Sequence, residues 1–241
     1  MNTKRIAEGI ILYNLENWKT DIEIKGFLFD MDGLILDTEK LYTRFWQEAA
    51  NALGYPMTKE QAIGMRSLNR EIGAAKLQSY FDEPIDYETV RKKRIELMNA
   101  YIEKEGVEAK PGIRELLSYL KENGIKTAIA TSSPLDRTEK YLKFVGLEGA
   151  FDKIISGYMV KNGKPKPDIY VLAASELGLA PQECIALEDS PSGLLSASRA
   201  GCYPVMIPDQ DEPTEETERL LYAKVNRLDY MIELMDWMKQ E

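Results

Sequence analysis

The chain has no histidine among its 241 residues, and this absence removes several kinds of chemistry. Without imidazole there are no histidine metal ligands, no serine–histidine–aspartate or cysteine–histidine catalysis, and no phosphohistidine intermediate. Proton transfer must therefore be carried out by carboxylates, lysine or tyrosine. Cysteine is almost as scarce. Cys184 and Cys202 are far apart and lie in apolar surroundings, so two reduced core thiols are expected rather than a disulfide framework.

Features of membrane proteins and of nucleic-acid-binding proteins are also missing. No apolar run approaches the ~20 residues that a membrane-spanning helix needs. Residues 1–20 lack the apolar centre and small-residue cleavage site of a signal peptide. The net charge of −9 argues against a surface that binds nucleic acid. We therefore expect a cytoplasmic protein without a membrane or nucleic-acid partner, and we favour a monomer.

The sequence does contain a regular alternation of short apolar runs and helical patterns. At 44% hydrophobic and 29% charged residues, its composition is that of a globular protein with a sizeable core. Buried strands are predicted at residues 26–29, 125–130, 153–156, 184–187, 203–207 and 224–225. Helices are predicted at residues 112–123, 134–145, 167–177, 191–200 and 229–238. This alternation predicts an α/β fold with a doubly wound, Rossmann-like parallel sheet that has helices on both faces.

One long segment breaks this alternation. Residues 39–108 show almost no β-branched alternation and predict only helices, at residues 39–53, 59–63, 69–80 and 87–105. The segment is inserted between the first and second strands, at the edge of the sheet where reactive groups are expected, and such an insertion is typical of a lid. The predicted organisation is an α/β core of residues 22–38 and 109–241 with an all-α helical cap of residues 39–108.

The N-terminal extension of residues 1–21 carries no recognisable chemistry. Its apolar residues recur at roughly helical spacing and predict a short amphipathic helix; they are Ile6, Ile10, Ile11, Leu15 and Trp18. Packing on the core and an oligomer contact are both open as its role.

Two carboxylates, Asp30 and Asp32, follow the first strand directly. The strand at residues 26–29 is continuously apolar, as expected for a strand buried on both faces of a parallel sheet. In open α/β sheets the reactive groups lie just beyond the carboxyl ends of the strands. Residues i and i+2 of an extended segment project to the same side, so both carboxylates are expected at one spot. Taken alone, the pattern is better explained by two turn residues that face water.

Three more segments place polar groups near the same edge of the predicted sheet. They supply hydroxyls, an ammonium and two carboxylates, from Thr131, Ser132, Ser133, Lys164, Glu188, Asp189 and Ser190. Each has an ordinary structural explanation: the last serine of each group as a helix cap, the lysine as a solvated loop residue, and the carboxylates as turn residues. Their convergence at one edge of one sheet favours a functional site instead.

Four motifs carry these residues, in the order DMDGLILDTE, ATSSP, GKPKPDIY and LEDSPSG. Over residues 24–241 the chain resembles the haloacid dehalogenase superfamily. The resemblance is to the branch with an α-helical cap after the first motif, which includes β-phosphoglucomutase and many sugar-phosphate phosphatases. It implies that Asp30 is the nucleophile and Asp32 the general acid–base. A carboxylate can attack phosphorus and form an aspartyl-phosphate, which divides one difficult displacement into two.

The resemblance also implies how the phosphoryl group and a metal are held. Thr131 and Lys164 are expected to bind the transferring phosphoryl group, and Ser132 to contact the substrate. Mg²⁺ is the expected cofactor, bound by oxygen atoms of Asp30, Asp32 (through its main-chain carbonyl), Glu188 and Asp189. An oxygen-only set suits Mg²⁺, because water and substrate phosphate complete its octahedron.

These inferences predict a Mg²⁺-dependent phosphatase that hydrolyses small phosphate monoesters, with sugar phosphates as expected substrates, through an aspartyl-phosphate. The alternatives are a phosphomutase of the β-phosphoglucomutase type and a catalytically idle phosphosugar-binding protein. The resembling mutase has a histidine just after its first motif that helps to control the second aspartate. Tyr42 stands in that place here and counts against the mutase.

Substrate choice is expected to lie in the cap. Arg66 and Arg70, in GMRSLNREIG, stand where related caps present a specificity loop, and either can bind a second anion or sugar hydroxyls. A solvated helix arginine is an equally good explanation for each. The basic run at residues 91–94 spreads around a full helical turn, so a solvated face is expected there.

Overall fold

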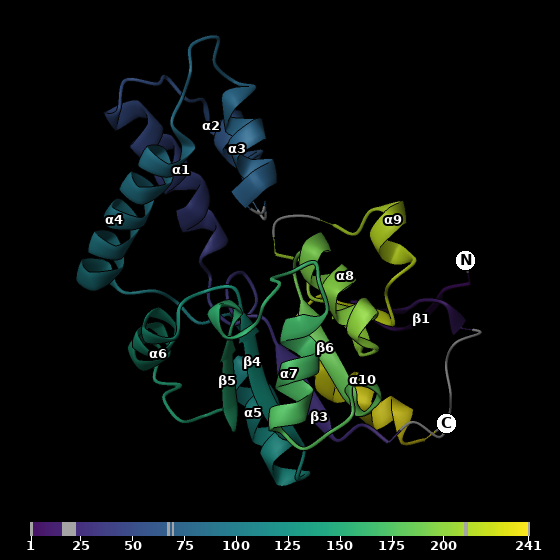
Figure 1. The fold of residues 1–241 in the computed structure, drawn as a ribbon. Helices are drawn as coiled ribbons and strands as arrows, with labels where there is room; N and C mark the ends of the chain where they lie inside the picture. The colour runs from purple at the N-terminus through teal and green to yellow at the C-terminus, as the bar shows by residue number, and fades with distance from the viewer. Residues whose placement is uncertain (1, 16–22, 67, 69, 210–211, 241) are drawn as a thin grey trace. The chain divides into compact units, whose positions relative to one another are not determined.

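A computed structural model describes the chain except for residues 1, 16–22, 67, 69, 210–211 and 241. The chain divides into two compact units (Figure 1), one formed by Met1–Leu36 with Ala109–Glu241 and the other by Asp37–Glu108. The first unit is an α/β structure, and the described elements of the second are all helices. Among the described helices, none combines the length and the apolar character needed to cross a membrane.

The first unit is built on one sheet, in which eight strands are described. Their order is β1-β2-β8-β7-β6-β3-β4-β5. The strands are β1 Lys4–Ala7, β2 Ile10–Leu12, β3 Gly26–Phe29, β4 Lys126–Thr131, β5 Lys153–Ser156, β6 Cys184–Glu188, β7 Tyr203–Met206 and β8 Ala223–Val225. The run from β8 to β5 is parallel throughout, which confirms the predicted parallel sheet. β3 lies inside it, between β6 and β4.

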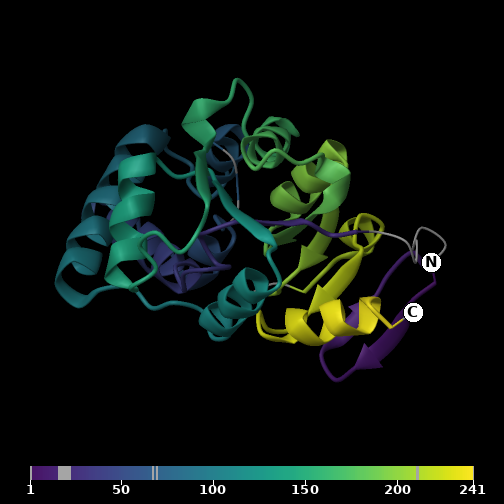
Figure 2. The same cartoon turned by 90° about the horizontal axis from the view of Figure 1, so that it is seen from below.

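Helices cover both faces of this sheet (Figures 1 and 2). α7 Asp168–Glu176 and α8 Pro191–Ala200 pack on one face, and α5 Ile113–Glu122 and α10 Tyr230–Met238 pack on the other. α6 Leu135–Phe144 packs against β5. Because β3 is covered on both sides, all four of its residues are buried. Its Leu28 joins the apolar core under α7 and α8.

The N-terminal segment forms a β-hairpin, so the predicted helix over residues 1–21 is wrong where the structure describes the chain. β1 and β2 pair antiparallel around a turn in which Gly9 has a φ of +75°. β2 then pairs antiparallel with β8, and its Ile10 and Leu12 are fully buried. Two alternating apolar residues on a sheet edge therefore outweigh the helical spacing of the wider segment. Trp18, which contributed to that spacing, lies outside the described residues.

The second unit packs its helices around an apolar core of its own. The described helices are α1 Glu39–Ala52, α2 Lys59–Ile63, α3 Arg70–Gln78 and α4 Tyr87–Glu105. Each unit therefore has the internal core expected of a domain. The residues buried in this one are Trp46, Ala49, Ala50, Met57, Ala62, Met65, Leu77, Tyr87 and Val90.

One cation of the basic run at residues 91–94 is buried, contrary to the predicted solvated face. Arg94 is only 7% exposed, and its guanidinium carbon lies 4.7 Å from the ring centre of Tyr42 and 4.9 Å from that of Trp46. A guanidinium stacks favourably on aromatic faces because its charge is delocalised and weakly hydrated. Arg94 shares its helix face with Val90 and Met98, four residues away on either side, and both of these are buried.

Candidate active site

The strand register brings the predicted catalytic carboxylate beside its predicted partners. Phe29 lies opposite Ile129 of β4 and Leu187 of β6, so the next residue, Asp30, leaves the sheet level with Glu188. The main-chain N–H of Asp30 donates to the carbonyl of Leu187 at 3.0 Å, which extends the β3–β6 ladder by one residue. Asp30 therefore lies at the carboxyl edge of the parallel sheet, where ligands bind in open α/β folds.

A tight turn follows Asp30. Gly33 has a φ of +85°, a conformation that other residues adopt at a cost, and its N–H donates to the carbonyl of Leu36 at 2.9 Å. The N–H groups of Ile35 and Leu36 both donate to the carbonyl of Met31. The DxDG pattern is thus a compact turn that holds Asp32 at the sheet edge.

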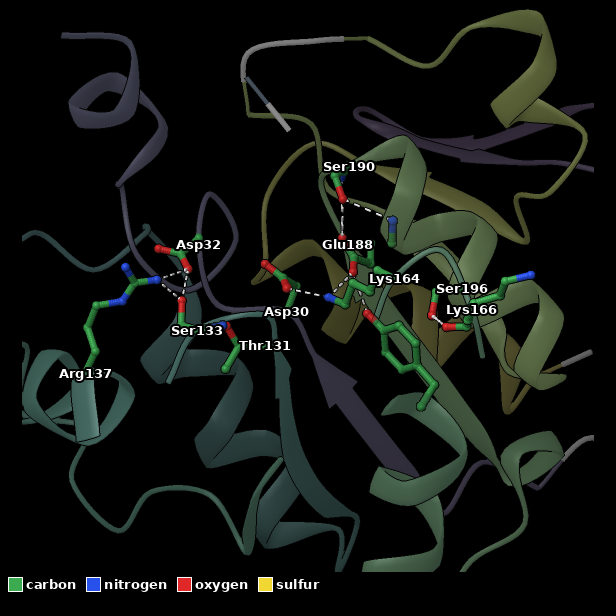
Figure 3. A network of polar contacts seen from close by, with 12 residues as sticks. Asp30, Asp32, Thr131, Ser133, Arg137, Lys164, Lys166, Glu188, Ser190 and Ser196 are labelled. Atoms are coloured by element: carbon green, nitrogen blue, oxygen red, sulfur yellow. Dashed lines mark hydrogen bonds and ion pairs between the residues drawn. The ribbon is translucent and has the colours of Figure 1, made fainter. Parts of the chain in front are cut away.

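Lys164 lies between two carboxylates from neighbouring strands (Figure 3). Its ammonium is 2.5 Å from Oδ1 of Asp30 and 2.5 Å from Oε1 of Glu188. The loop that carries Lys164 is fastened to α8, because Ser196 donates to the carbonyl of Lys166 at 2.5 Å and Arg199 donates to the carbonyl of Pro165 at 2.9 Å. The long lysine side chain is consequently held in place at its base as well as at its tip.

Glu188 is fully buried and its carboxylate is surrounded by donors. The Tyr170 hydroxyl donates to Oε1 at 2.6 Å, and the Ser190 hydroxyl donates to Oε2 at 3.0 Å. Ser190 is also the N-cap of α8, accepting from the N–H of Gly193 at 3.2 Å, which confirms the cap predicted there. Gly193 is required by the carboxylate itself, since a Cβ atom at that position would lie 1.8 Å from Oε1 of Glu188.

Burial and charge act in opposite directions on these groups. Burial and the neighbouring carboxylates of Glu188 and Asp32 raise the pKa of Asp30, the ammonium of Lys164 lowers it, and the net result is a pKa of about 7. Burial alone would lower the pKa of Lys164. The carboxylates of Asp30 and Glu188 more than offset this, so its pKa lies above the ordinary value and the lysine is a permanent cation. Lys164 therefore acts as a fixed positive charge rather than as a base.

Asp32 is held by a second group of residues, away from Lys164 (Figure 3). Ser133 donates its hydroxyl to Oδ2 of Asp32 at 2.7 Å, and Nη2 of Arg137 lies 3.9 Å from the same oxygen. Arg137 also donates to the Ser133 hydroxyl. The predicted capping role of Ser133 is wrong, because Pro134 is the N-cap of α6 and no side chain caps that helix. The Ser133 hydroxyl donates to the carboxylate of Asp32 instead of capping the helix.

A cluster of carboxylates at this edge meets the requirements of a metal site. One oxygen from each of Asp30, Glu188 and Asp189 lies within 4.8 Å of the others. Three carboxylates against the one ammonium of Lys164 leave about two negative charges at a largely buried position. A divalent cation with a preference for oxygen ligands would neutralise that excess.

The remaining predicted residues differ in their surroundings. Thr131, at the end of β4, is buried, and its Oγ1 accepts from the N–H of Ser133 at 3.0 Å. Ser132 is exposed at the same loop. Arg66 and Arg70 belong to the helical unit, where Arg70 pairs with Glu88 at 2.5 Å. The substrate-binding roles of these last three stay predictions.

Sequence reasoning missed three residues of this site, namely Tyr170, Arg137 and Gly193. Arg137 lies four residues after Ser133, Gly193 three residues after Ser190, and Tyr170 six residues after Lys164. The signal for Tyr170 was a polar aromatic at the start of a helix that follows the lysine loop. No pattern in one sequence indicates that Gly193 faces a carboxylate, because that contact depends on how α8 packs.

Comparison with known proteins agrees with this geometry. A family description, haloacid dehalogenase-like hydrolase, matches residues 24–201. Hexitol phosphatase A of Escherichia coli strain K12 is 36% identical over 185 residues, covering 76% of this chain and 82% of that protein. The phosphorylated carbohydrates phosphatase of Thermotoga maritima is 34% identical over 178 residues, covering 74% and 82%. A solved T. maritima structure, assigned provisionally as a β-phosphoglucomutase, has 27% identity and a TM-score of 0.72 over 89% of this chain and 99% of its own.

Proposed function

The chain belongs to the haloacid dehalogenase-like hydrolases, and from this premise we propose that it hydrolyses phosphate monoesters of small sugars or sugar alcohols. The observation that carries the proposal is the buried contact of Asp30 with Lys164, next to Glu188 and Asp189. A nucleophilic carboxylate, a permanent cation and an acidic cluster are the groups that phosphoryl transfer needs. The two curated relatives described above are phosphatases of phosphorylated carbohydrates and of hexitols, which supports this substrate class.

In the first step, an oxygen of the Asp30 carboxylate attacks phosphorus and the bond between phosphorus and the ester oxygen breaks. Asp32, protonated at this stage, gives its proton to the departing sugar oxygen. Lys164 offsets the charge on the phosphoryl oxygens, while Thr131 and the main-chain N–H groups around it orient them. The products of this step are the free sugar, an aspartyl-phosphate on Asp30 and an ionised Asp32.

In the second step, water attacks the phosphorus of the aspartyl-phosphate. Asp32, now a carboxylate, takes a proton from that water, and the bond between phosphorus and the Asp30 oxygen breaks. Inorganic phosphate is released, Asp30 is again a carboxylate and Asp32 is again protonated. Asp30 therefore serves as the nucleophile and Asp32 alternates between acid and base, and no histidine is required.

The proposed cofactor is Mg²⁺, held by carboxylate oxygens of Asp30 and Asp189 and by the Asp32 carbonyl. When bound, Mg²⁺ would neutralise charge on the phosphoryl group. One carboxylate oxygen of Glu188 contacts Lys164 and Tyr170, and the other contacts Ser190. Glu188 therefore also holds the Lys164 ammonium in place. The helical unit is proposed to be the cap, with Arg66 and Arg70 as candidate contacts for the sugar or a second anion.

The test is phosphate release from a panel of hexose and hexitol phosphates with Mg²⁺. We expect Asp30→Asn to lower kcat by at least about 10³-fold and Asp32→Asn by about 10²- to 10⁴-fold. Asp136→Asn, an exposed carboxylate on α6, serves as the matched control and should leave kcat unchanged. Turnover by Asp30→Asn at the wild-type rate would disprove the covalent route.

A metal-removal experiment tests the proposed cofactor separately. EDTA should abolish turnover, and Mg²⁺ should restore it, because the acidic cluster offers oxygen ligands only. Restoration by Zn²⁺ but not by Mg²⁺ would contradict the oxygen-ligand site.

A phosphomutase is the second candidate, favoured by the likeness to the T. maritima structure. Both activities form the same aspartyl-phosphate and differ in whether water or a sugar hydroxyl accepts the phosphoryl group. The experiment follows free phosphate and glucose 6-phosphate together from β-glucose 1-phosphate, Mg²⁺ and a trace of the bisphosphate. We expect phosphate to accumulate. Stoichiometric glucose 6-phosphate with almost no free phosphate would make the protein a mutase.

A further inference from the structure

Three groups of the core unit form a chain of contacts that ends on Asp32 (Figure 3). Arg137 donates to the hydroxyl of Ser133, and that hydroxyl donates to Oδ2 of Asp32 at 2.7 Å. We propose that Ser133 and Arg137 are positioning residues that hold the Asp32 carboxylate for both proton transfers. The proposal rests on the proposed function, because it assigns the control of Asp32 within the same site.

Hydrogen bonds hold the main chain of Ser133 at both its N–H and its carbonyl, so the position of its side chain is fixed. Its N–H donates to Oγ1 of Thr131 at 3.0 Å, and its carbonyl accepts from the hydroxyl of Ser156 at 2.6 Å. The residue is 1% exposed, so water does not compete for these contacts. The hydroxyl of a serine that precedes a helix commonly accepts a capping hydrogen bond from the first turn, but α6 has no side-chain cap. The hydroxyl is thereby available to Asp32, and its direction is set by the main chain.

Arg137 strengthens the contact of Ser133 with Asp32 from one turn further along α6. It stands four residues after Ser133, its side chain is only 19% exposed, and its guanidinium lies 5.9 Å from the ring centre of Tyr141. A cation that donates to a hydroxyl polarises it, and the hydroxyl then donates more strongly to the next acceptor. The guanidinium is also 3.9 Å from Asp32, which adds direct attraction. Asp32 is thus drawn to one place by a neutral donor and a charge together.

The location of this chain has a consequence for the fate of the intermediate. Asp32, Ser133, Arg137 and Ser156 all belong to the α/β unit. The contacts through which Ser133 and Arg137 hold Asp32 for proton transfer therefore lie within the α/β unit itself. An aspartyl-phosphate served by such a base is short-lived, which favours hydrolysis over transfer to a second sugar.

The test compares two esters whose leaving groups differ in their need for a proton. A hexitol phosphate releases an alkoxide that must be protonated, whereas 4-nitrophenyl phosphate releases a stable phenolate. For Ser133→Ala and Arg137→Gln, we expect kcat/KM for the hexitol phosphate to fall about 10²-fold, and that for the nitrophenyl ester by less than about fivefold. Lys143→Gln removes an exposed cation from the same helix and is the control for Arg137→Gln. Arg137→Gln also tests the proposal should Ser133→Ala fail to fold.

A second measurement follows the other proton transfer. Both variants should show a burst of nitrophenol that approaches the enzyme concentration, because the slower base leaves the aspartyl-phosphate waiting for water. Equal losses on the two esters without a burst, or no loss in either variant, would overturn the positioning role alone. Wild-type protein that releases phosphate from neither ester would overturn the proposed function together with this inference.

Discussion

Tyr170 contacts both members of the ion pair that Glu188 forms with Lys164. Its hydroxyl donates to Glu188 at 2.6 Å, and the centre of its ring lies 5.2 Å from the Lys164 ammonium. Tyr170→Phe keeps the ring and removes the hydroxyl. We expect kcat/KM for a sugar phosphate to fall about 10- to 100-fold, since a hydrogen bond to a charged group contributes about 1.5–3 kcal/mol. Tyr158→Phe, at a tyrosine that is 73% exposed, is the control, and equal rates in both variants would contradict the role.

Replacing Gly193 by alanine has two effects of opposite sign on the stability of the protein. Alanine is favoured over glycine inside a helix by up to about 1 kcal/mol, so Gly193→Ala would stabilise α8 if space were free. The added Cβ would instead lie 1.8 Å from Oε1 of Glu188 and force that carboxylate away from Lys164. We expect lower turnover and a lower Tm. Ser198→Ala in the same helix should change neither, and an active, more stable Gly193→Ala would show that Glu188 can move freely.

Cys184 and Cys202 are buried and free, as the sequence predicts. Burial raises the pKa of Cys184 to about 12 and raises that of Cys202 as well. At pH 8 about one Cys184 thiol in 10⁴ would be ionised, and the thiolate is the reactive form. We expect no reaction of the folded protein with a thiol-disulfide reagent at pH 8 and two reacting thiols after denaturation. Rapid labelling of the folded protein would show that this core opens readily.

At the scale of elements, the β1–β2 hairpin is part of the α/β core rather than a loose extension. Ile10 is fully buried and pairs with Val225 of β8. Ile10→Ala should lower the free energy of unfolding by about 2–5 kcal/mol, the usual range for a buried aliphatic side chain. Arg5→Ala, on the exposed part of β1, should change it by less than about 0.5 kcal/mol. The two values come from urea denaturation, and equal small effects would place the hairpin outside the cooperative core.

Most elements of both units were predictable, because their bounds follow local sequence patterns. Strands such as Lys153–Ser156 and helices such as Tyr87–Glu105 have the predicted bounds, since an apolar run or a helical period ends at a glycine or a cap. The meeting of Asp30 and Glu188 was also predictable, because the ends of neighbouring parallel strands share one edge, and Lys164 lies in the loop between β5 and α7.

The errors fall where a distant contact decides the outcome. Ile10 joins a strand because β8 offers it an edge, and no local rule contains β8. Ser133 leaves its helix uncapped because Asp32 lies 101 residues away in sequence but within hydrogen-bond distance. Arg94 is buried because its guanidinium lies over two aromatic rings of α1 and is stabilised by cation–π contacts with them. Each is a tertiary contact that outweighs a local preference.

At the scale of the whole molecule, the two chain segments that join the units are paired with each other. Leu36 forms an antiparallel bridge with Ala109, and the N–H of Asp37 donates to the carbonyl of Glu108 at 2.9 Å. Removing residues 39–108 and joining the ends should therefore leave a core that folds, as shown by a cooperative thermal transition. We expect this core to lose discrimination between sugar phosphates and much of its rate. Unchanged selectivity over the same panel would place recognition in the α/β unit.

The central position of β3 has a consequence for how the chain folds. Phe29 pairs with Leu187, so the strand that precedes Asp30 waits for a neighbour that is synthesised 158 residues later. The helical unit is one contiguous segment, Asp37–Glu108, and can form while β3 is still exposed. An apolar strand left open in this way is prone to pair with other chains. The early stages of synthesis are therefore the period in which this protein is most open to aggregation, and the completion of β6 ends it.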